Sequence, residues 1–189
     1  MKFFVIPLLV LSGTGLPAKA QDIPPPAYQI AATLSDVPST VLYAIALQES
    51  GRSLNNGTLR PWPWTLNVAG KSFYSESYND ACTHLTVTLR TTSARRVDVG
   101  LGQINVGYHR HRVKEPCDLL NPYLNLAIAG QILAEQHRPG QDWLIAMGKY
   151  HSPANGAAAA RYRASVQRHY VRLQLQHPST PSKRLVALK

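Results

Sequence analysis

The sequence predicts an α+β domain that is predominantly helical and contains a small antiparallel β-hairpin element. Several segments carry apolar residues at helical spacing, whereas residues 65–74 have the pattern of strand, turn and strand. The composition, 44% hydrophobic and 16% charged, excludes an acidic disordered tail or a low-complexity polymer. The length of 189 residues allows one sizeable core but leaves little room for two complete domains.

The first twenty residues have the pattern of a secretory signal peptide. Lys2 precedes an apolar run at residues 3–11, and Ala18-Lys19-Ala20 provides a small-residue cleavage site. The run is too short for a transmembrane helix, which needs about 20 residues. We therefore expect export to an oxidising compartment such as the periplasm.

We divide the chain into a signal peptide at 1–20, a domain at 21–176 and a mobile basic tail at 177–189. Removal of the signal peptide leaves 18 basic against 10 acidic residues, so the net charge falls from +10 to +8. Nucleic-acid binding is disfavoured because an exported chain with no recognisable nucleic-acid motif gives this charge another explanation. No later segment is apolar enough to cross a membrane, and we expect a monomer.

The N-terminal half is expected to contain two helices and a hairpin. Residues 27–34 form the first helix, and Pro38 suits the first turn of a second, which Gly51 can end. Residues 55–63, rich in Gly, Asn and Pro, are expected to form a loop before the strands at 65–74.

Residues 76–92 fit two patterns. Leu85, Val87 and Leu89 alternate with Thr as in a strand, whereas Ala81, Leu85 and Leu89 also form a helical stripe. We expect a helix here. Residues 97–99 then form a short extended piece.

Three helices are expected in the C-terminal half. Asn121-Pro122 provides a cap and a first residue, residues 142–150 form a short helix, and Asn155 can cap a long one. The apolar side of the first is expected to comprise Leu124, Ile128, Ile132 and Leu133. The buried side of the last is expected to comprise Tyr162, Val166, Tyr170 and Leu173.

Cys82 and Cys117 are predicted to form one structural disulfide, because the expected compartment is oxidising. Two cysteines alone provide too few ligands for a metal site. The basic run at residues 108–112 contains His-x-His, which also lacks enough ligands for zinc, so we expect a solvated loop or one that contacts anionic wall components. We expect no metal and no cofactor.

Glu49 is the carboxylate that its position singles out. It follows Leu42 by seven residues and Ile45 by four, so it lies on the apolar side of its predicted helix. Burial there would raise the pKa of the carboxyl, and a neutral carboxylic acid near pH 7 can protonate a leaving oxygen. The alternative is a structural carboxylate at the end of the stripe that reaches water or caps a loop.

Three segments give this carboxylate a context. The first, residues 44–51, reads AIALQESG and contains Glu49; the second, residues 100–105, reads GLGQIN; the third, residues 146–151, reads AMGKYH. In order and approximate spacing they resemble the motifs of lytic transglycosylases of the soluble-transglycosylase (SLT) type. The resemblance covers roughly residues 30–170.

The resemblance implies a lysozyme-like fold and a single catalytic acid, Glu49. It implies that Gln103 and Tyr150 orient the sugar or hydrogen-bond near the acid, and that Ser50 contacts neighbouring amide groups. The glycines of the second motif would let the backbone approach the ligand, although they could simply form a turn. The candidate substrate-binding residues are Ser50, Gly100, Gly102, Gln103, Asn105 and Tyr150.

The chain departs from the family pattern at two places. Gly102 stands where the family usually has Met, and His151-Ser152-Pro153 stands where it has Asn-Ala-Gly. Residues 62–68 and 150–152 resemble the accessory transglycosylases of conjugative elements and type IV secretion systems. Trp62, Trp64 and Tyr108 could stack on sugars, but core packing is the favoured interpretation.

These observations predict a lytic transglycosylase that cleaves the MurNAc–GlcNAc β-1,4 bond of peptidoglycan and forms 1,6-anhydro-MurNAc. Its partners would be glycan strands and a secretion or conjugation machinery. Glycosidases usually apply two carboxylates, but Asp98, the other one beside a motif, is expected to organise a turn or strand end. The alternatives are a hydrolytic, lysozyme-like muramidase and a non-catalytic wall-binding component.

Overall fold

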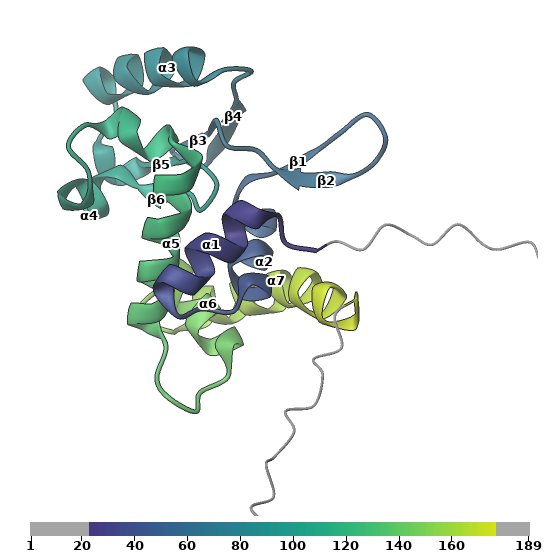
Figure 1. The fold of residues 1–189 in the computed structure, drawn as a ribbon. Helices are drawn as coiled ribbons and strands as arrows, with labels where there is room; N and C mark the ends of the chain where they lie inside the picture. Colours follow the sequence, from purple (N-terminus) through teal and green to yellow (C-terminus); the bar gives the residue numbers. More distant parts are fainter. Residues whose placement is uncertain (1–22, 177–189) are drawn as a thin grey trace, which may run out of the picture.

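The computed structural model describes residues 23–176 and confirms a predominantly helical α+β architecture with small antiparallel sheets (Figure 1). The predicted signal peptide and basic tail lie outside the described residues. The α-helices of the described part are α1 (Pro26–Ser35), α2 (Ser39–Ser50), α3 (Tyr78–Thr91), α4 (Val106–His109), α5 (Pro122–Gln136), α6 (Trp143–His151) and α7 (Ala157–Gln176). Its strands are β1 (Gly51–Ser53), β2 (Leu59–Pro61), β3 (Thr65–Val68), β4 (Lys71–Tyr74), β5 (Val97–Val99) and β6 (Ile104–Asn105), and its 3₁₀ helices are η1 (Ala94–Arg96), η2 (Arg110–Arg112) and η3 (Pro116–Leu120).

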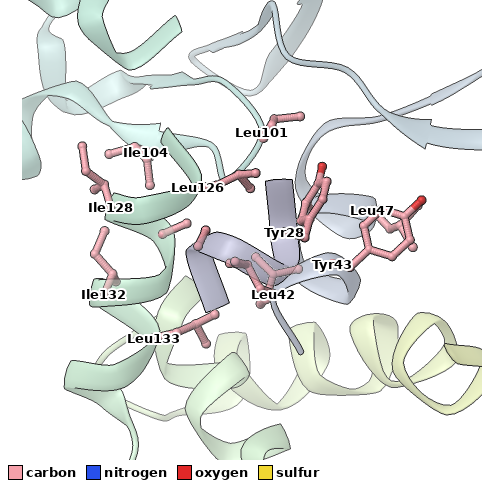
Figure 2. Packing of buried hydrophobic residues seen from close by; sticks show 14 of the residues in the cluster. Tyr28, Leu42, Tyr43, Leu47, Leu101, Ile104, Leu126, Ile128, Ile132 and Leu133 are labelled. Carbon is pink, nitrogen blue, oxygen red and sulfur yellow. The ribbon is translucent and has the colours of Figure 1, made fainter. Parts of the chain in front are cut away.

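Helix α2 is the core helix of the fold. Helices α1, α5 and α7 pack against it, and residues 41–47 are at most 6% exposed. Tyr28 of α1 packs edge-on against Tyr43 of α2, with ring centroids 4.8 Å apart, in a core that also contains Leu126 and Leu133 of α5 (Figure 2). The helix is thus buried on more sides than its sequence stripe suggests.

The predicted hairpin is present as β3 and β4, and it belongs to a four-stranded sheet of order β4-β3-β5-β6. Ala69 and Gly70 turn the chain with positive φ angles of 52° and 91°. Strand β5 pairs antiparallel with β3, with Leu66 opposite Val99, and β6 pairs with β5, with Asp98 opposite Asn105. This register places the end of the second motif beside Asp98.

The region expected to be a loop at residues 55–63 contains a strand. Residues of β2 pair with β1, with Gly51 opposite Pro61 and Ser53 opposite Leu59, in a separate hairpin that extends away from the rest of the fold (Figure 1). The pairing was not predicted because Pro61, Trp62 and Pro63 read as loop residues, and because a three-residue strand is too short for a periodic pattern.

The expected helix in residues 76–92 is confirmed as α3. The side chain of Ser77 accepts a hydrogen bond from the backbone N–H of Asp80, which caps the helix. Ala81 and Leu85 are fully buried, whereas Val87 is 55% exposed. The helical stripe therefore describes the packing, and the strand-like alternation through Val87 does not.

Three details of the expected helices are corrected. In α5 the position of Leu124 is 37% exposed, and the neighbouring Asn125 is buried in its place. Pro38 is the N-cap of α2, not part of its first turn. Asn155 lies two residues before α7 with a φ of 53°, and its side-chain oxygen accepts a hydrogen bond from Arg163 instead of capping the helix.

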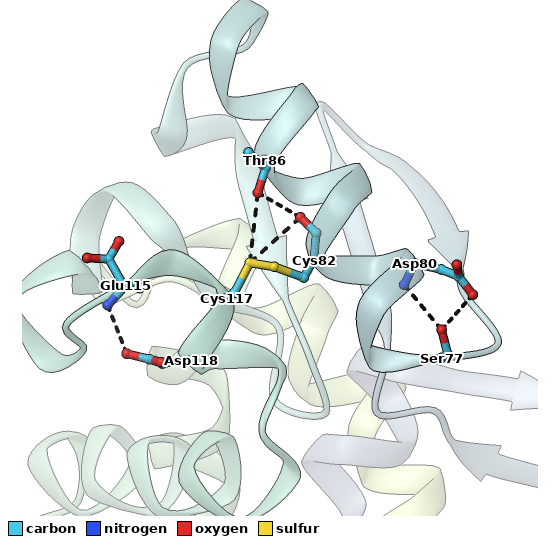
Figure 3. Close-up of a disulfide and its surroundings, with 7 residues drawn as sticks. All are labelled: Ser77, Asp80, Cys82, Thr86, Glu115, Cys117 and Asp118. Carbon is cyan, nitrogen blue, oxygen red and sulfur yellow. Dashed lines mark hydrogen bonds between the residues drawn. A yellow bond between two sulfur atoms is a disulfide. The ribbon is translucent and has the colours of Figure 1, made fainter.

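The disulfide between Cys82 and Cys117 is present and joins α3 to η3 (Figure 3). The Cα atoms of the two cysteines are 5.3 Å apart, and the bond closes a sequence separation of 35 residues. Leu119 and Leu120, at the end of η3, are fully buried. The bond therefore ties an outlying helix to a segment that enters the core.

No single helix within residues 23–176 is both long and apolar enough to span a membrane. Helices α1 and α2 meet that criterion only when taken together, and the chain bends by 116° between them.

Candidate active site

A cavity of about 650 Å³ lies where the end of α2 meets the four-stranded sheet, α4 and the end of α6. All three motif segments contribute to its wall. The residues that line it are Glu49, Asn67, Asp98, Gln103, Ile104, Asn105, Tyr108, His109, Ile132, Tyr150, His151, Ser152 and Pro153. The structure thus brings together Glu49, Gln103, Asn105 and Tyr150, four of the residues singled out from the sequence.

Glu49 lies at the C-terminal end of α2, which is closely packed. Gly51 ends the helix where a side chain would collide with the carbonyl oxygen of Leu47 and would lie 3.0 Å from the side chain of Leu59. Ser50 is fully buried, and its hydroxyl donates to the carbonyl of Leu101 at 2.8 Å. Ser50 therefore does not line the cavity; it fastens the first motif to the second behind Glu49.

The environment of Glu49 favours its neutral form. Burial raises the pKa of this carboxyl from 4.5 to about 7; the neighbouring hydroxyl of Tyr162 lowers it, and the charge of Asp98 raises it. Near pH 7 a substantial share of Glu49 is therefore the protonated acid, which can donate a proton to a bound oxygen.

Two tyrosines from separate helices surround this carboxyl. Burial raises the pKa of Tyr150 and that of Tyr162, and the charge of Glu49 adds to both effects, so both hydroxyls stay neutral. Tyr150 donates to the carbonyl of Gly102 at 2.6 Å. The hydroxyl of Tyr162 is buried, and it lies close enough to the carboxyl of Glu49 for their interaction to lower the pKa of that group.

Tyr162 is a site residue that sequence reasoning assigned only to the core. Its helical position on the buried side of α7 was predicted correctly, but nothing local to residue 162 connects it with residue 49. His151 stacks flat on the Tyr162 ring, with ring centroids 4.6 Å apart and planes 7° apart. Because His151 lines the cavity, this departure from the family pattern is part of its wall.

The second motif is held by Asn125, which sequence reasoning also missed. Asn125 is 1% exposed; its amide nitrogen donates to the carbonyls of Val99 and Leu119, and its oxygen accepts from the N–H of Gly102 at 2.8 Å. A buried side-chain amide with three such bonds fixes the loop it contacts. An asparagine within the apolar stripe of a predicted helix was the available signal.

The two glycines of this motif are required by close packing. Gly100 has a φ of 80°, and a side chain there would collide with Asn125. At Gly102 a Cβ would lie 2.8 Å from the Cβ of Ala129 and 2.9 Å from the hydroxyl of Tyr150. Neither glycine lines the cavity. A Met side chain at position 102 would therefore collide with Tyr150 as it is placed in this chain.

Gln103 and Asn105 line the cavity but are tied to the protein by hydrogen bonds. The side-chain nitrogen of Gln103 donates to the carbonyl of Gly100 at 2.8 Å and to that of Thr65 at 3.2 Å. Asn105 donates to the carboxylate of Asp98 at 2.8 Å, and its oxygen caps α4. Asn105 thus orients Asp98 and α4.

Asp98 shares the cavity with Glu49, beyond the turn-organising role expected for it. Burial raises the pKa of Asp98, whereas the hydrogen bond from Asn105 and the nearby His151 lower it. The two carboxyls therefore have different environments, because only Asp98 receives a strong hydrogen bond from an amide.

Of the three aromatic residues considered for sugar stacking, only Tyr108 lines the cavity. The indole nitrogen of Trp62 donates to the carbonyl of Ser75 at 2.6 Å, and Trp64 packs against the core. Within residues 23–176, no group of three or more His, Cys, Asp or Glu side chains could hold a metal ion.

The raised pKa of Glu49 predicts a pH-dependent cost to stability. The folded state holds the proton of Glu49 up to about pH 7, whereas the unfolded chain releases it near pH 4.5, so stability is lost as the pH rises between these values. By that linkage, Glu49→Gln should gain up to about 3 kcal/mol in unfolding free energy relative to the wild type between pH 5 and pH 8. Urea unfolding of both proteins at pH 5 and at pH 8 measures this gain. If the two proteins differed in unfolding free energy by the same amount at both pH values, the raised pKa would be contradicted.

Comparison of the chain with models of protein families, with curated proteins and with solved structures finds no match.

Proposed function

We propose that this chain is a peptidoglycan lytic transglycosylase with a lysozyme-like fold, which acts after export to the periplasm. The observation that carries the proposal is Glu49, whose pKa is raised to about 7 in a cavity that it shares with Gln103 and Tyr150. A carboxylic acid of this kind is what protonation of a glycosidic oxygen requires. The order of the three motifs supports the choice of reaction.

In the first half of the reaction, protonated Glu49 donates its proton to the oxygen between MurNAc and GlcNAc. The bond from that oxygen to the anomeric carbon breaks, and the sugar ring develops positive charge. The hydroxyl of Tyr162, which stays neutral and lowers the pKa of Glu49, stabilises the carboxylate that the acid becomes.

In the second half, the carboxylate of Glu49 accepts the proton of the muramoyl 6-hydroxyl while that oxygen attacks the anomeric carbon. The product is 1,6-anhydro-MurNAc, no water is consumed, and Glu49 is again protonated. One carboxyl thus serves as acid and then as base, which suits a group whose pKa is near 7. Local opening of the wall for a conjugation or secretion apparatus is the role that the sub-family resemblance suggests.

Product analysis tests this proposal directly. Purified glycan strands are digested with the mature protein, and the products are identified by mass spectrometry. Ends carrying 1,6-anhydro-MurNAc are expected. Reducing MurNAc ends without any anhydro form would overturn the transglycosylase assignment, and the absence of cleavage would overturn the enzymatic one.

A hydrolytic muramidase is the second candidate, and the presence of Asp98 in the same cavity favours it. In that reaction Asp98 would act as the second carboxylate and water would be consumed. For a transglycosylase, Asp98→Asn should leave anhydro products and shift the alkaline limb of the pH profile to lower pH, because the charge that raises the pKa of Glu49 is removed. Loss of cleavage together with reducing-end products in the wild type would favour the muramidase.

A further inference from the structure

The rim of the cavity carries an aromatic side chain that the protein holds open to solvent. Tyr108 lines the cavity and is 63% exposed. It belongs to the single-turn helix α4, where the side-chain oxygen of Asn105 accepts hydrogen bonds from the N–H groups of Gly107 and Tyr108, both at 3.1 Å. The backbone that carries the ring is therefore fixed, although the ring is exposed.

Arg95 lies beside this ring. Its guanidinium carbon is 5.7 Å from the centroid of the Tyr108 ring, which is within cation–π distance. The contact is built into the backbone, because a Cβ at Gly107 would lie 2.7 Å from the backbone nitrogen of Arg95. Helix α4 thus packs directly on η1, and the ring and the guanidinium are presented together.

The charge on Arg95 is not neutralised by a carboxylate in the described part of the chain. The ion pairs of residues 23–176 join Arg52 to Glu76, Arg110 to Glu115 and Arg112 to Glu135, and Arg95 takes part in none of them. Exposed basic residues also lie on η1, η2 and the loop that follows: Arg96, Arg110, His111 and Lys114, of which Arg110 pairs with Glu115. A positive charge without an ion-pair partner among the described residues therefore lies beside the Tyr108 ring.

We propose that Tyr108 and Arg95 form a rim subsite for a sugar that carries a carboxylate. The apolar face of the sugar packs on the Tyr108 ring, and the guanidinium of Arg95 pairs with the carboxylate. This assignment rests on the proposed function, under which the sugar is a muramoyl residue. The carboxylate then belongs either to its lactyl group or to the attached stem peptide.

The experiment compares matched glycan strands. Strands that bear stem peptides and strands freed of them by an amidase are each used untreated and after carbodiimide amidation, which converts carboxylates to uncharged amides. The catalytic efficiency kcat/KM is measured for the wild type, Arg95→Gln and Tyr108→Ala. Loss of efficiency on amidation of only one kind of strand identifies the source of the carboxylate.

We expect amidation to lower the wild-type kcat/KM about fivefold to tenfold on at least one kind of strand. Arg95→Gln should lower it by a similar factor on untreated strands and should no longer respond to amidation. Tyr108→Ala should lower it on every strand, whereas Tyr108→Phe, which keeps the ring face, should not. The matched controls are Arg161→Gln and Tyr123→Ala, which change exposed residues away from the cavity.

The failures of the two proposals are distinguishable. If the wild type cleaves strands but Arg95→Gln responds to amidation as the wild type does, the subsite is wrong and the proposed function stands. If the wild type cleaves no strand, the proposed function fails. Competition by short duplex DNA that depends on Arg95 would assign the surface to phosphate and would also overturn the sugar subsite. Circular dichroism of each variant confirms that it is folded.

Discussion

Replacing Glu49 with Gln is expected to lower the cleavage of glycan strands by at least about a thousandfold, because the variant can neither donate nor accept the proton. Glutamine has nearly the same size and can still hydrogen-bond to its neighbours, so the cavity keeps its shape. The loss should appear in kcat more than in KM, since the proton is transferred in the transition state. Release of anhydro ends per unit time measures the effect.

The matched control is Glu76→Gln. Glu76 pairs with Arg52 at 2.9 Å on the surface and does not line the cavity, so its loss should change activity little. A folded Glu49→Gln protein that still binds glycan strands in a pull-down separates loss of chemistry from loss of binding. If the variant retained more than about a tenth of the activity, the acid would have to lie elsewhere, and Asp98 would be the first candidate.

The elements with long periodic patterns could be predicted from the sequence, because each has one clear apolar side and a local start signal. Asn121-Pro122 opens α5 as expected, with the asparagine oxygen accepting from two backbone N–H groups. The short elements could not be predicted. Strand β6 has two residues and α4 has four, so neither is long enough to show a period, and both depend on pairing with β5 or packing on η1.

The site residues that belong to sequence motifs could be predicted. Those that join the site only through contacts with distant parts of the chain could not. Glu49, Gln103 and Tyr150 come from three segments that meet at one cavity. Asn125 and Tyr162 could not be assigned to the site, because the site residues that they contact, Gly102 and Glu49, lie 23 and 113 positions away in the chain. The role of a buried polar atom depends on the groups that it contacts, and only the tertiary structure specifies those groups.

Ser50 shows that sequence position can also assign a residue to the site wrongly. Its place beside the acid made a substrate contact plausible, but its hydroxyl donates to Leu101 and to Ala46, and the side chain is fully buried. A serine at a helix end can return its hydrogen bond to the preceding turn, so sequence proximity to Glu49 does not place it in the cavity. Its contribution is to join two motifs.

Removing the disulfide is expected to lower the free energy of unfolding by about 3–4 kcal/mol, because the unfolded chain regains the freedom of the closed loop. For a domain of this size, that corresponds to a fall in Tm of about 10 °C. The variant is Cys82→Ser/Cys117→Ser, and thermal unfolding followed by circular dichroism measures it. The wild type in dithiothreitol should unfold like the double variant, which itself should not respond to the reductant.

The position of the disulfide also determines what its loss should leave intact. η3 supplies the carbonyl of Leu119, which accepts a hydrogen bond from Asn125 at 2.7 Å, and Asn125 in turn holds Gly102. Because Leu119 and Leu120 are fully buried, the core should keep η3 in place below the new Tm. Cleavage at 25 °C should therefore persist in the double variant and should disappear together with the fold on heating. Loss of activity well below its Tm would instead show that the disulfide itself positions the second motif.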